Sequence, residues 1–229
     1  MAQFIVTGAN RGIGLEMVRR LSARGDAVVA TTRSLSVLPL ESSTLRGVRW
    51  TTLDAADPAS IEGFAARVRD SGVSTIDTLI NNAGVSSQAK ALDQLTALEL
   101  HRVFAVNAFA PLLVAKAILP MFATTGRRLI VNVSSQLASI TNNSGGSTYP
   151  YRASKAALNQ LTVSLANELR PSGLTCLAVH PGWVRTDMGG SQAPLSPEQS
   201  VEHLLALIDR AGPDQSGRFF NYDGTPLPW

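Results

Sequence analysis

The side chains best placed for proton transfer in this sequence are a tyrosine and a lysine, Tyr151 and Lys155. They are four residues apart, and residues at i and i+4 share one face of a helix. An ammonium group beside a phenol favours the phenolate and lowers the phenol pKa from its usual value of about 10. A phenol tuned in this way can act as a general acid or base on a carbonyl compound or an alcohol.

Hydroxyl and amide side chains follow three apolar runs elsewhere in the chain. Ser135 follows one such run, Asn81–Gly84 ends a second, and Pro181–Thr186 follows a third. The carboxyl ends of parallel strands meet at one edge of a sheet, where open α/β folds bind their ligands. We therefore expect these groups to gather around Tyr151 in one site.

A glycine-rich turn, Thr7–Gly14, joins the first apolar run to the first helical segment. Its spacing differs from the common G-x-G-x-x-G pattern, and a tight turn without a ligand has a similar composition. Glycines nevertheless let the backbone approach a pyrophosphate closely, and a helix N-terminus supplies N–H donors for it. The turn predicts a dinucleotide site formed by these residues: Gly8, Asn10, Arg11, Gly12, Ile13 and Gly14.

The end of the second apolar run indicates which dinucleotide is bound. An NAD site usually has a carboxylate here for the ribose 2′-hydroxyl, but this chain has Thr32 followed by Arg33. Arg11 in the glycine turn can face the same corner, and two guanidinium groups suit a 2′-phosphate. At about 1.5–3 kcal/mol for each charge-assisted contact, the pair favours NADPH over NADH by roughly two orders of magnitude or more.

Two aspartates follow the third apolar run. We expect Asp54 to accept a hydrogen bond from the adenine amino group and Asp57 to cap the helix that begins at Pro58. On spacing alone, the two roles could be exchanged.

Together these motifs resemble those of the short-chain dehydrogenase/reductase family, in the family's order and along essentially the whole chain. The matching positions are Thr7–Gly14, Asp54, Asn81–Gly84, Asn107, Ser135, Tyr151, Lys155 and Pro181–Thr186. His180–Met188 and Asn221–Trp229 are most similar to the branch that contains the C-factor and sniffer-type carbonyl reductases. The resemblance implies an NADP(H)-dependent carbonyl reductase and suggests a homodimer or homotetramer.

The resemblance also implies a role for each matching residue. Tyr151 would protonate the carbonyl oxygen as hydride arrives, and Lys155 would lower the Tyr151 pKa and hold the nicotinamide ribose. Ser135 would orient the carbonyl group, and Asn107 would hold a water that relays protons to Lys155. The cofactor would also contact the remaining positions, which are Asn81, Ala83, Gly84, Pro181, Gly182, Val184 and Thr186.

Several neighbouring residues compete for these roles. Ser134 is the alternative to Ser135, but the family pattern Asn-Val-Ser-Ser favours the second serine. Tyr149 has no lysine four residues later, and Asn132 is interpreted as a hydrogen-bonding bridge between strands. The polar loop Ser139–Ser147, which we expect to be mobile, would border the substrate pocket.

Short β-branched runs alternate with longer segments of helical periodicity. This pattern predicts a single α/β domain over residues 1–229, with a doubly wound, Rossmann-like parallel sheet and helices on both faces. The expected strands are Gln3–Thr7, Ala27–Thr32, Val48–Thr52, Thr78–Asn81, Leu129–Val133, Leu174–His180 and Arg218–Asn221. The expected helices are Gly12–Arg24, Pro58–Ser71, Leu98–Phe122, Pro150–Arg170 and Pro197–Ala211.

Composition excludes several other classes of protein. Hydrophobic residues make up 45% of the chain and charged residues 16%, which excludes intrinsic disorder. The net charge of +3 comes from scattered residues, so no nucleic-acid groove is predicted. One cysteine and three dispersed histidines predict no metal site and fit a reducing compartment. The apolar stretch Ala108–Ala123 is too short to cross a bilayer, so we expect a cytoplasmic protein that does not bind membranes.

Two other functions remain open at this point. One is an NAD-linked alcohol dehydrogenase working in the oxidative direction, against which Thr32 and Arg33 argue. The other is a signalling or sensor protein that binds the dinucleotide without turnover. A broken Tyr/Lys/Ser set would mark the second function, whereas the set is complete here.

Overall fold

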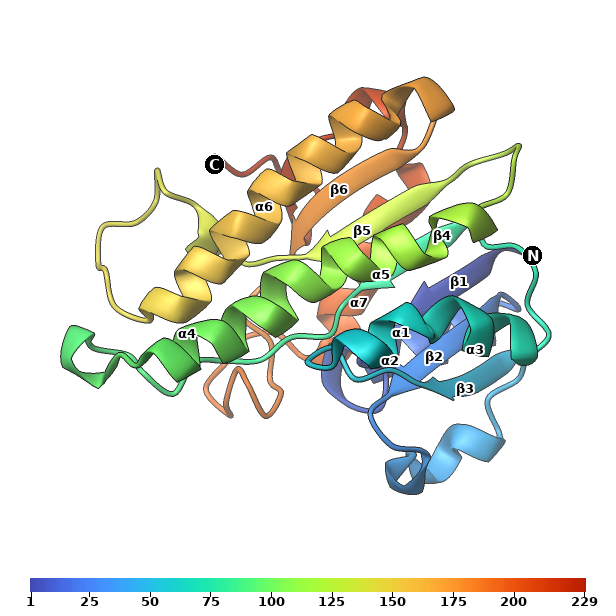
Figure 1. The fold of residues 1–229 in the computed structure, drawn as a ribbon, viewed down its shortest axis with the longest axis horizontal. Coiled ribbons are helices and arrows are strands. Elements are labelled where there is room, and N and C mark those ends of the chain that lie inside the picture. The colour runs from blue at the N-terminus through green and yellow to red at the C-terminus, as the bar shows by residue number, and fades with distance from the viewer.

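The computed structural model describes residues 1–229 and contains one sheet of seven parallel strands (Figure 1). The strands are β1 Gln3–Val6, β2 Ala27–Thr32, β3 Val48–Thr52, β4 Thr78–Asn81, β5 Leu129–Val133, β6 Thr175–His180 and β7 Arg218–Asn221. Their order, β3-β2-β1-β4-β5-β6-β7, is that of a doubly wound sheet. The predicted fold class is therefore confirmed, and every predicted strand lies within one residue of its observed bounds.

Helices cover both faces of this sheet. They are α1 Gly12–Ala23, α2 Pro58–Glu62, α3 Phe64–Asp70, α4 Ala97–Phe104, α5 Ala110–Ile118, α6 Tyr149–Leu169 and α7 Pro197–Arg210. One buried cluster joins α1 and α7 to one face, and a second joins α2, α3, α5 and α6 to the other. Figure 1 looks onto the second face, where α5 and α6 run in front of β5 and β6.

Burial on both faces explains why the strands are apolar without interruption. Phe4 and Val6 belong to the cluster under α1 and α7, whereas Ile5 between them belongs to the cluster on the opposite face. All three side chains are 0% exposed. A strand with only one buried face would need polar residues at alternate positions.

The helix predicted over 58–71 is split into α2 and α3 at Gly63, so this prediction was wrong in detail. Gly63 caps both helices, and a Cβ atom there would lie 2.8 Å from Arg67 Nη1. The Arg67 side chain crosses this break and donates hydrogen bonds to the carbonyl groups of Ser60 and Thr52. The break gives Arg67 access to carbonyl groups of the preceding segment.

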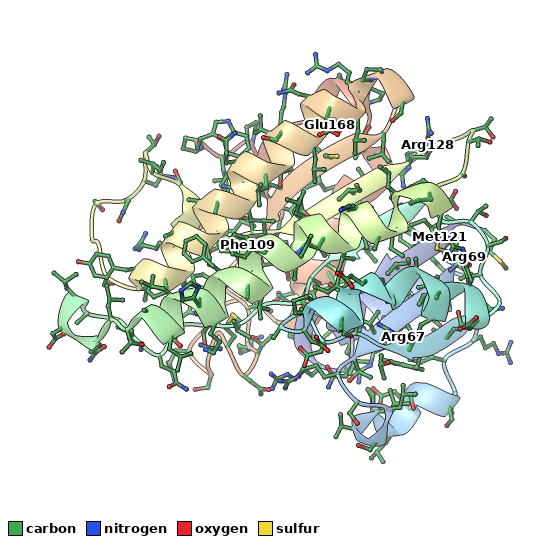
Figure 2. All side chains as sticks on the ribbon, in the orientation of Figure 1. Arg67, Arg69, Phe109, Met121, Arg128 and Glu168 are labelled. Atoms are coloured by element: carbon green, nitrogen blue, oxygen red, sulfur yellow. The ribbon has the colours of Figure 1, made fainter.

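The helix predicted over 98–122 is also interrupted, by a π-helical turn at Ala105–Phe109 between α4 and α5. Pro111 has no N–H for the carbonyl of Asn107, so a regular α-helix would lose a hydrogen bond here. The π turn that replaces it places Asn107 in its centre, fully buried. Figure 2 shows Phe109 leaving this turn on the side of α6.

The segment Ala97–Met121 has a mean hydropathy of 1.8 in its most apolar window and is long enough to cross a membrane. It is longer than the apolar stretch considered from the sequence. Half of the window is buried inside the protein, where α5 contributes to the core against the sheet. Packing on the sheet accounts for its apolar composition.

Candidate active site

Tyr151 and Lys155 lie in the first turns of α6, as their spacing predicts. Lys155 is buried, and its Nζ donates a 2.7 Å hydrogen bond to the carbonyl oxygen of Val133, the last residue of β5. Tyr151 is only partly buried. The lysine therefore attaches the start of α6 to the end of β5, with the half-buried tyrosine one helical turn before it.

Burial is the largest influence on the pKa values of both Tyr151 and Lys155. Burial raises the pKa of Tyr151, and a hydrogen bond with Ser135 is the only influence that lowers it. Burial also lowers the pKa of Lys155 to about 8. The Lys155 ammonium donates to the Val133 carbonyl and desolvation dominates at the phenol, so the lowering of the Tyr151 pKa by Lys155 stays a prediction.

The two serines after β5 point to different partners. Ser134 donates a 2.7 Å hydrogen bond to Oδ1 of Asn159 in α6, so its hydroxyl holds the helix to the sheet. The Ser135 oxygen accepts a 3.1 Å hydrogen bond from the Leu137 N–H, and the hydroxyl is the group that partners Tyr151. The structure therefore brings Ser135, rather than Ser134, next to the phenol.

Asn107 uses its side chain to hold a loop. Its Oδ1 accepts from the Val85 N–H at 2.9 Å, and its Nδ2 donates to the Val85 carbonyl at 2.9 Å and to Ser154 Oγ at 3.1 Å. A Cβ atom on Gly84 would lie 3.4 Å from Asn107 Oδ1 and 3.6 Å from Lys155 Nζ. Asn107 thus ties the end of β4 to α6, directly beside the lysine.

Three asparagines at the sheet edge have different environments. The Asn81 amide is buried and donates to Pro111 and to Asn132, which in turn donates to Thr162 of α6. Asn132 bridges two strands, as predicted, and these hydrogen bonds direct the Asn81 amide into the interior. Alternation along the strand end instead turns Asn82 towards the glycine turn.

Asn82 is a structural residue of the site that sequence reasoning missed. Its Nδ2 donates to the carbonyl groups of Thr7 and Gly8, at 3.0 and 3.1 Å, and its backbone N–H donates to Thr7 Oγ1. A Cβ atom on Gly14 would lie 2.5 Å from this Nδ2 and 2.4 Å from the Gly8 oxygen. The sequence signal was the second of two adjacent asparagines, which must point the opposite way from the first.

The glycine turn has the features of an anion site. Gly8 has a φ of +63°, and a Cβ atom there would lie 2.9 Å from Ala83 Cα, so only glycine fits. The N-terminus of α1 has no side-chain cap and no acidic residue in its first turn. Its N–H donors are therefore not capped by the protein's own side chains, as a phosphate site requires.

Arg11 and Arg33 lie on the surface near this turn, but Arg11 has an unexpected partner. Its guanidinium donates to the Asp187 carboxylate at 2.5 Å, with side-chain exposures of 68% and 76%. Arg33 is exposed at the end of β2. The structure thus pairs Arg11 with the loop after β6, and a corner shared with Arg33 stays a prediction.

The structure shows which of the two aspartates after β3 caps the following helix. Asp57 caps α2 through the Ala59 N–H at 3.0 Å, as expected. One oxygen of Asp54 accepts from the Ala56 N–H at 2.9 Å. Asp57 is therefore the capping residue, and the spacing ambiguity is removed.

The segment after β6 is folded back on itself next to the glycine turn. The Pro181 carbonyl accepts a hydrogen bond from Ser200, and the buried Val184 pairs with Leu195. A Cβ atom on Gly12 would lie 3.2 Å from Thr186 Cγ2. The structure therefore brings Thr186 and the glycine turn together, although they are far apart in the sequence.

Two buried titratable side chains of β6 have strongly shifted pKa values. Burial lowers the pKa of His180 to about 4 and raises the pKa of Cys176 to about 12. No group of three histidine, cysteine, aspartate or glutamate side chains is placed to hold a metal ion.

Comparison with known families agrees with this geometry. The family model described as short chain dehydrogenase matches residues 3–195, which include every motif of the site. The chain belongs to the short-chain dehydrogenase family. Tyr151, Lys155 and Ser135 all lie within the matched range.

Individual relatives place the chain in one part of the family. The C-signal protein of Myxococcus xanthus is 45% identical over 154 residues, which cover 67% of this chain and 93% of that protein. The carbonyl reductase Sniffer of D. melanogaster is 33% identical, with a TM-score of 0.93 and complete coverage of both chains. An NADPH-bound carbonyl reductase from chicken fatty liver is 34% identical, with a TM-score of 0.91 over 100% of this chain and 99% of that one. The chain is a short-chain dehydrogenase of the C-factor and sniffer type.

We predict that Asn82→Ala loosens the glycine turn and destabilises the protein. The variant leaves the Thr7 and Gly8 carbonyl groups without their side-chain donor, which costs about 1–3 kcal/mol. Urea denaturation measures this loss, with Asn142→Ala on the exposed loop as a control that changes stability little. Equal stability of the two variants would contradict the bracing role of Asn82.

Proposed function

We propose that the protein reduces a carbonyl compound (an aldehyde, ketone or quinone) to the alcohol, with NADPH as the hydride donor. The observation that carries this proposal is the placement of Tyr151 and Ser135 side by side at the end of β5, with the buried Lys155 behind them. The glycine turn lies across the same edge of the sheet. The similar structures named as carbonyl reductases support the same reaction.

The cofactor, when bound, supplies the hydride. The uncapped N-terminus of α1 and the close approach at Gly8 and Gly14 fit its pyrophosphate. We propose that the remaining cleft residues also contact the cofactor, through their backbone or their side chains. They are Asn10, Gly12, Ile13, Asp54, Ala83, Gly84, Pro181, Gly182, Val184 and Thr186. The family resemblance also assigns Asn81 to the cofactor site. Asn81 would support the site from the protein interior, through its hydrogen bond to Asn132.

The raised pKa of Tyr151 favours the reductive direction. At neutral pH the phenol keeps its proton, which an acid catalyst must do. The alkoxide that forms on hydride transfer is a much stronger base than a phenolate, so the phenol can still protonate it. An alcohol dehydrogenase working by the same residue needs the phenolate, which burial disfavours.

Lys155 and Asn107 support this proton transfer. Below its pKa of about 8 the lysine is charged, and it would stabilise the phenolate left on Tyr151 after the proton has moved. Asn107 holds Val85 with its side chain, so any water relay to Lys155 would use its main-chain carbonyl in the π turn. Ser135 would donate its hydroxyl proton to the substrate oxygen and orient it.

We also propose that the protein is a cytoplasmic homodimer or homotetramer that acts on small molecules. The helical layer opposite α1 and α7 carries large apolar side chains that are exposed, with Leu98 at 80%, Phe109 at 51% and Leu113 at 39%. Figure 2 shows Phe109 on this layer. A second copy that covers these residues would remove them from water, and light scattering of the purified protein tests the mass.

We predict that Tyr151→Phe abolishes carbonyl reduction but leaves NADPH binding intact. Loss of a general acid lowers kcat by about 100-fold to 10,000-fold, because the remaining groups cannot protonate the alkoxide. NADPH absorbance with a panel of aldehydes, ketones and quinones measures turnover, and Tyr149→Phe on the same helix is the matched control. Near-wild-type turnover in Tyr151→Phe would remove this residue from its role, and a silent panel with tight NADPH binding would favour a sensor.

We predict that Arg33→Ala raises the KM for NADPH far more than the KM for NADH, by roughly 10-fold to 100-fold. Arg11→Ala should raise the KM for NADPH further. To bind the 2′-phosphate, Arg11 must release Asp187, and this exposed ion pair contributes at most about 1 kcal/mol. Arg218→Ala, an exposed substitution on β7, is the control. Equal changes for both cofactors would contradict a 2′-phosphate site.

A further inference from the structure

The segment after β7 turns back and runs antiparallel to that strand. Gly224 donates to the Asn221 carbonyl at 2.9 Å, which closes the turn, and Leu227 donates to the Phe219 carbonyl at 2.9 Å. Phe220 and Pro226 form an antiparallel bridge. Thr225–Trp229 therefore lies along the outer edge of the sheet as a fixed strap.

Trp229 in this strap packs its ring on the sheet and accepts hydrogen bonds from a loop with its main-chain oxygen. Its ring stacks on the buried Phe219, with centroids 5.6 Å apart and planes 14° apart. Its carbonyl oxygen accepts two hydrogen bonds of 3.0 Å, one from the Thr141 N–H and one from the Ser139 hydroxyl. Figure 1 shows the chain end marked C on the same side of the molecule as the loop that precedes α6.

This loop, 136–148, joins the two residues that carry the proposed chemistry. It begins directly after Ser135, whose oxygen accepts from the Leu137 N–H, and it ends where α6 starts, two residues before Tyr151. Ser139 is 1% exposed, whereas Ile140 between the two tethered residues is 78% exposed. The Trp229 carbonyl thus fixes the first half of a loop that sequence composition alone predicts to be mobile.

The second half of the loop is held in an unfavourable backbone conformation. Ser147 and Thr148 have φ values of 58° and 47°, a region that a β-branched residue such as threonine rarely adopts. The Thr148 N–H donates to the Lys90 carbonyl at 2.8 Å. Strain of this kind persists only where neighbouring contacts impose it, so the loop needs its anchor points.

We propose that Trp229 is a positioning residue for the active site. By holding Ser139 and Thr141, it fixes the loop that sets Ser135 against Tyr151 and forms the substrate side of the cleft. The role rests on the proposed reductase function, but the tether itself does not. The cofactor residues lie on other segments, so the tether should affect the carbonyl substrate and not NADPH.

Trp229→Ala tests this proposal in the full-length protein. Without the ring stacked on Phe219, the carbonyl is no longer held and the loop is released. Hydrogen–deuterium exchange should show faster exchange at the Thr141 amide, and kcat/KM for the carbonyl substrate should fall about ten-fold, as expected for the loss of one or two hydrogen bonds. The dissociation constant for NADPH should stay within about two-fold of the wild-type value.

Two further variants separate positioning from general instability. Trp229→Phe keeps an aromatic ring over Phe219 and should restore slow exchange and most of the activity. Ser139→Ala removes one of the two hydrogen bonds without touching the sheet edge, and its effect on kcat/KM should be smaller after Trp229→Ala than in the wild-type protein. This double-mutant comparison holds even if Trp229→Ala also lowers the melting temperature.

The exchange measurement tests the tether, and the kinetics test its role in positioning the active site. Unchanged exchange at Thr141 in Trp229→Ala would overturn the tether, and faster exchange with unchanged kcat/KM would overturn its role in positioning. Equal losses of NADPH and substrate affinity would also overturn it, because they indicate a global effect. If the wild-type protein reduces no carbonyl compound, the proposed function fails, while exchange still decides whether Trp229 holds the loop.

Discussion

The active site depends on one hydrogen bond between a buried ammonium group and a main-chain carbonyl, from Lys155 Nζ to Val133. Burying a charge is costly unless it is well partnered, and burial alone lowers the pKa of this lysine to about 8. The bond joins the first turns of α6 to the last residue of β5. Because Ser135 follows Val133 by two residues and Tyr151 precedes Lys155 by one helical turn, this single contact sets both reactive hydroxyl groups.

Buried side-chain amides extend the same constraint to the rest of the sheet edge. Asn107 holds the loop after β4 against α6, Asn132 joins β4, β5 and α6, and Asn82 holds the glycine turn. These bonds are 2.8–3.1 Å long, and each satisfies a buried or partly buried polar group. The strands thus provide an edge, and the asparagines connect its separate loops into one cleft.

Sequence patterns predicted the strands and the central residues of the site, because burial on both faces leaves a continuous apolar signal and helical spacing is a local property. They did not predict the π turn at Ala105–Phe109 or the break at Gly63. They also could not predict the hydrogen-bond partners of each asparagine, the pairing of Arg11 with Asp187, or the tether from Trp229 to Ser139. These features depend on contacts between residues far apart in the chain, as does the desolvation that raises the pKa of Tyr151.

The most direct test of this account is the pH dependence of carbonyl reduction at saturating NADPH. A neutral phenol as acid and a charged lysine beside it predict a constant kcat/KM between about pH 6 and about pH 7. Above this range, kcat/KM should fall as Lys155 loses its proton, with a midpoint near its pKa of about 8. Lys155→Met should lower the plateau and remove that midpoint. A rate that rises through pH 8 in the wild-type protein would show that the phenolate is the reactive form and would contradict the account.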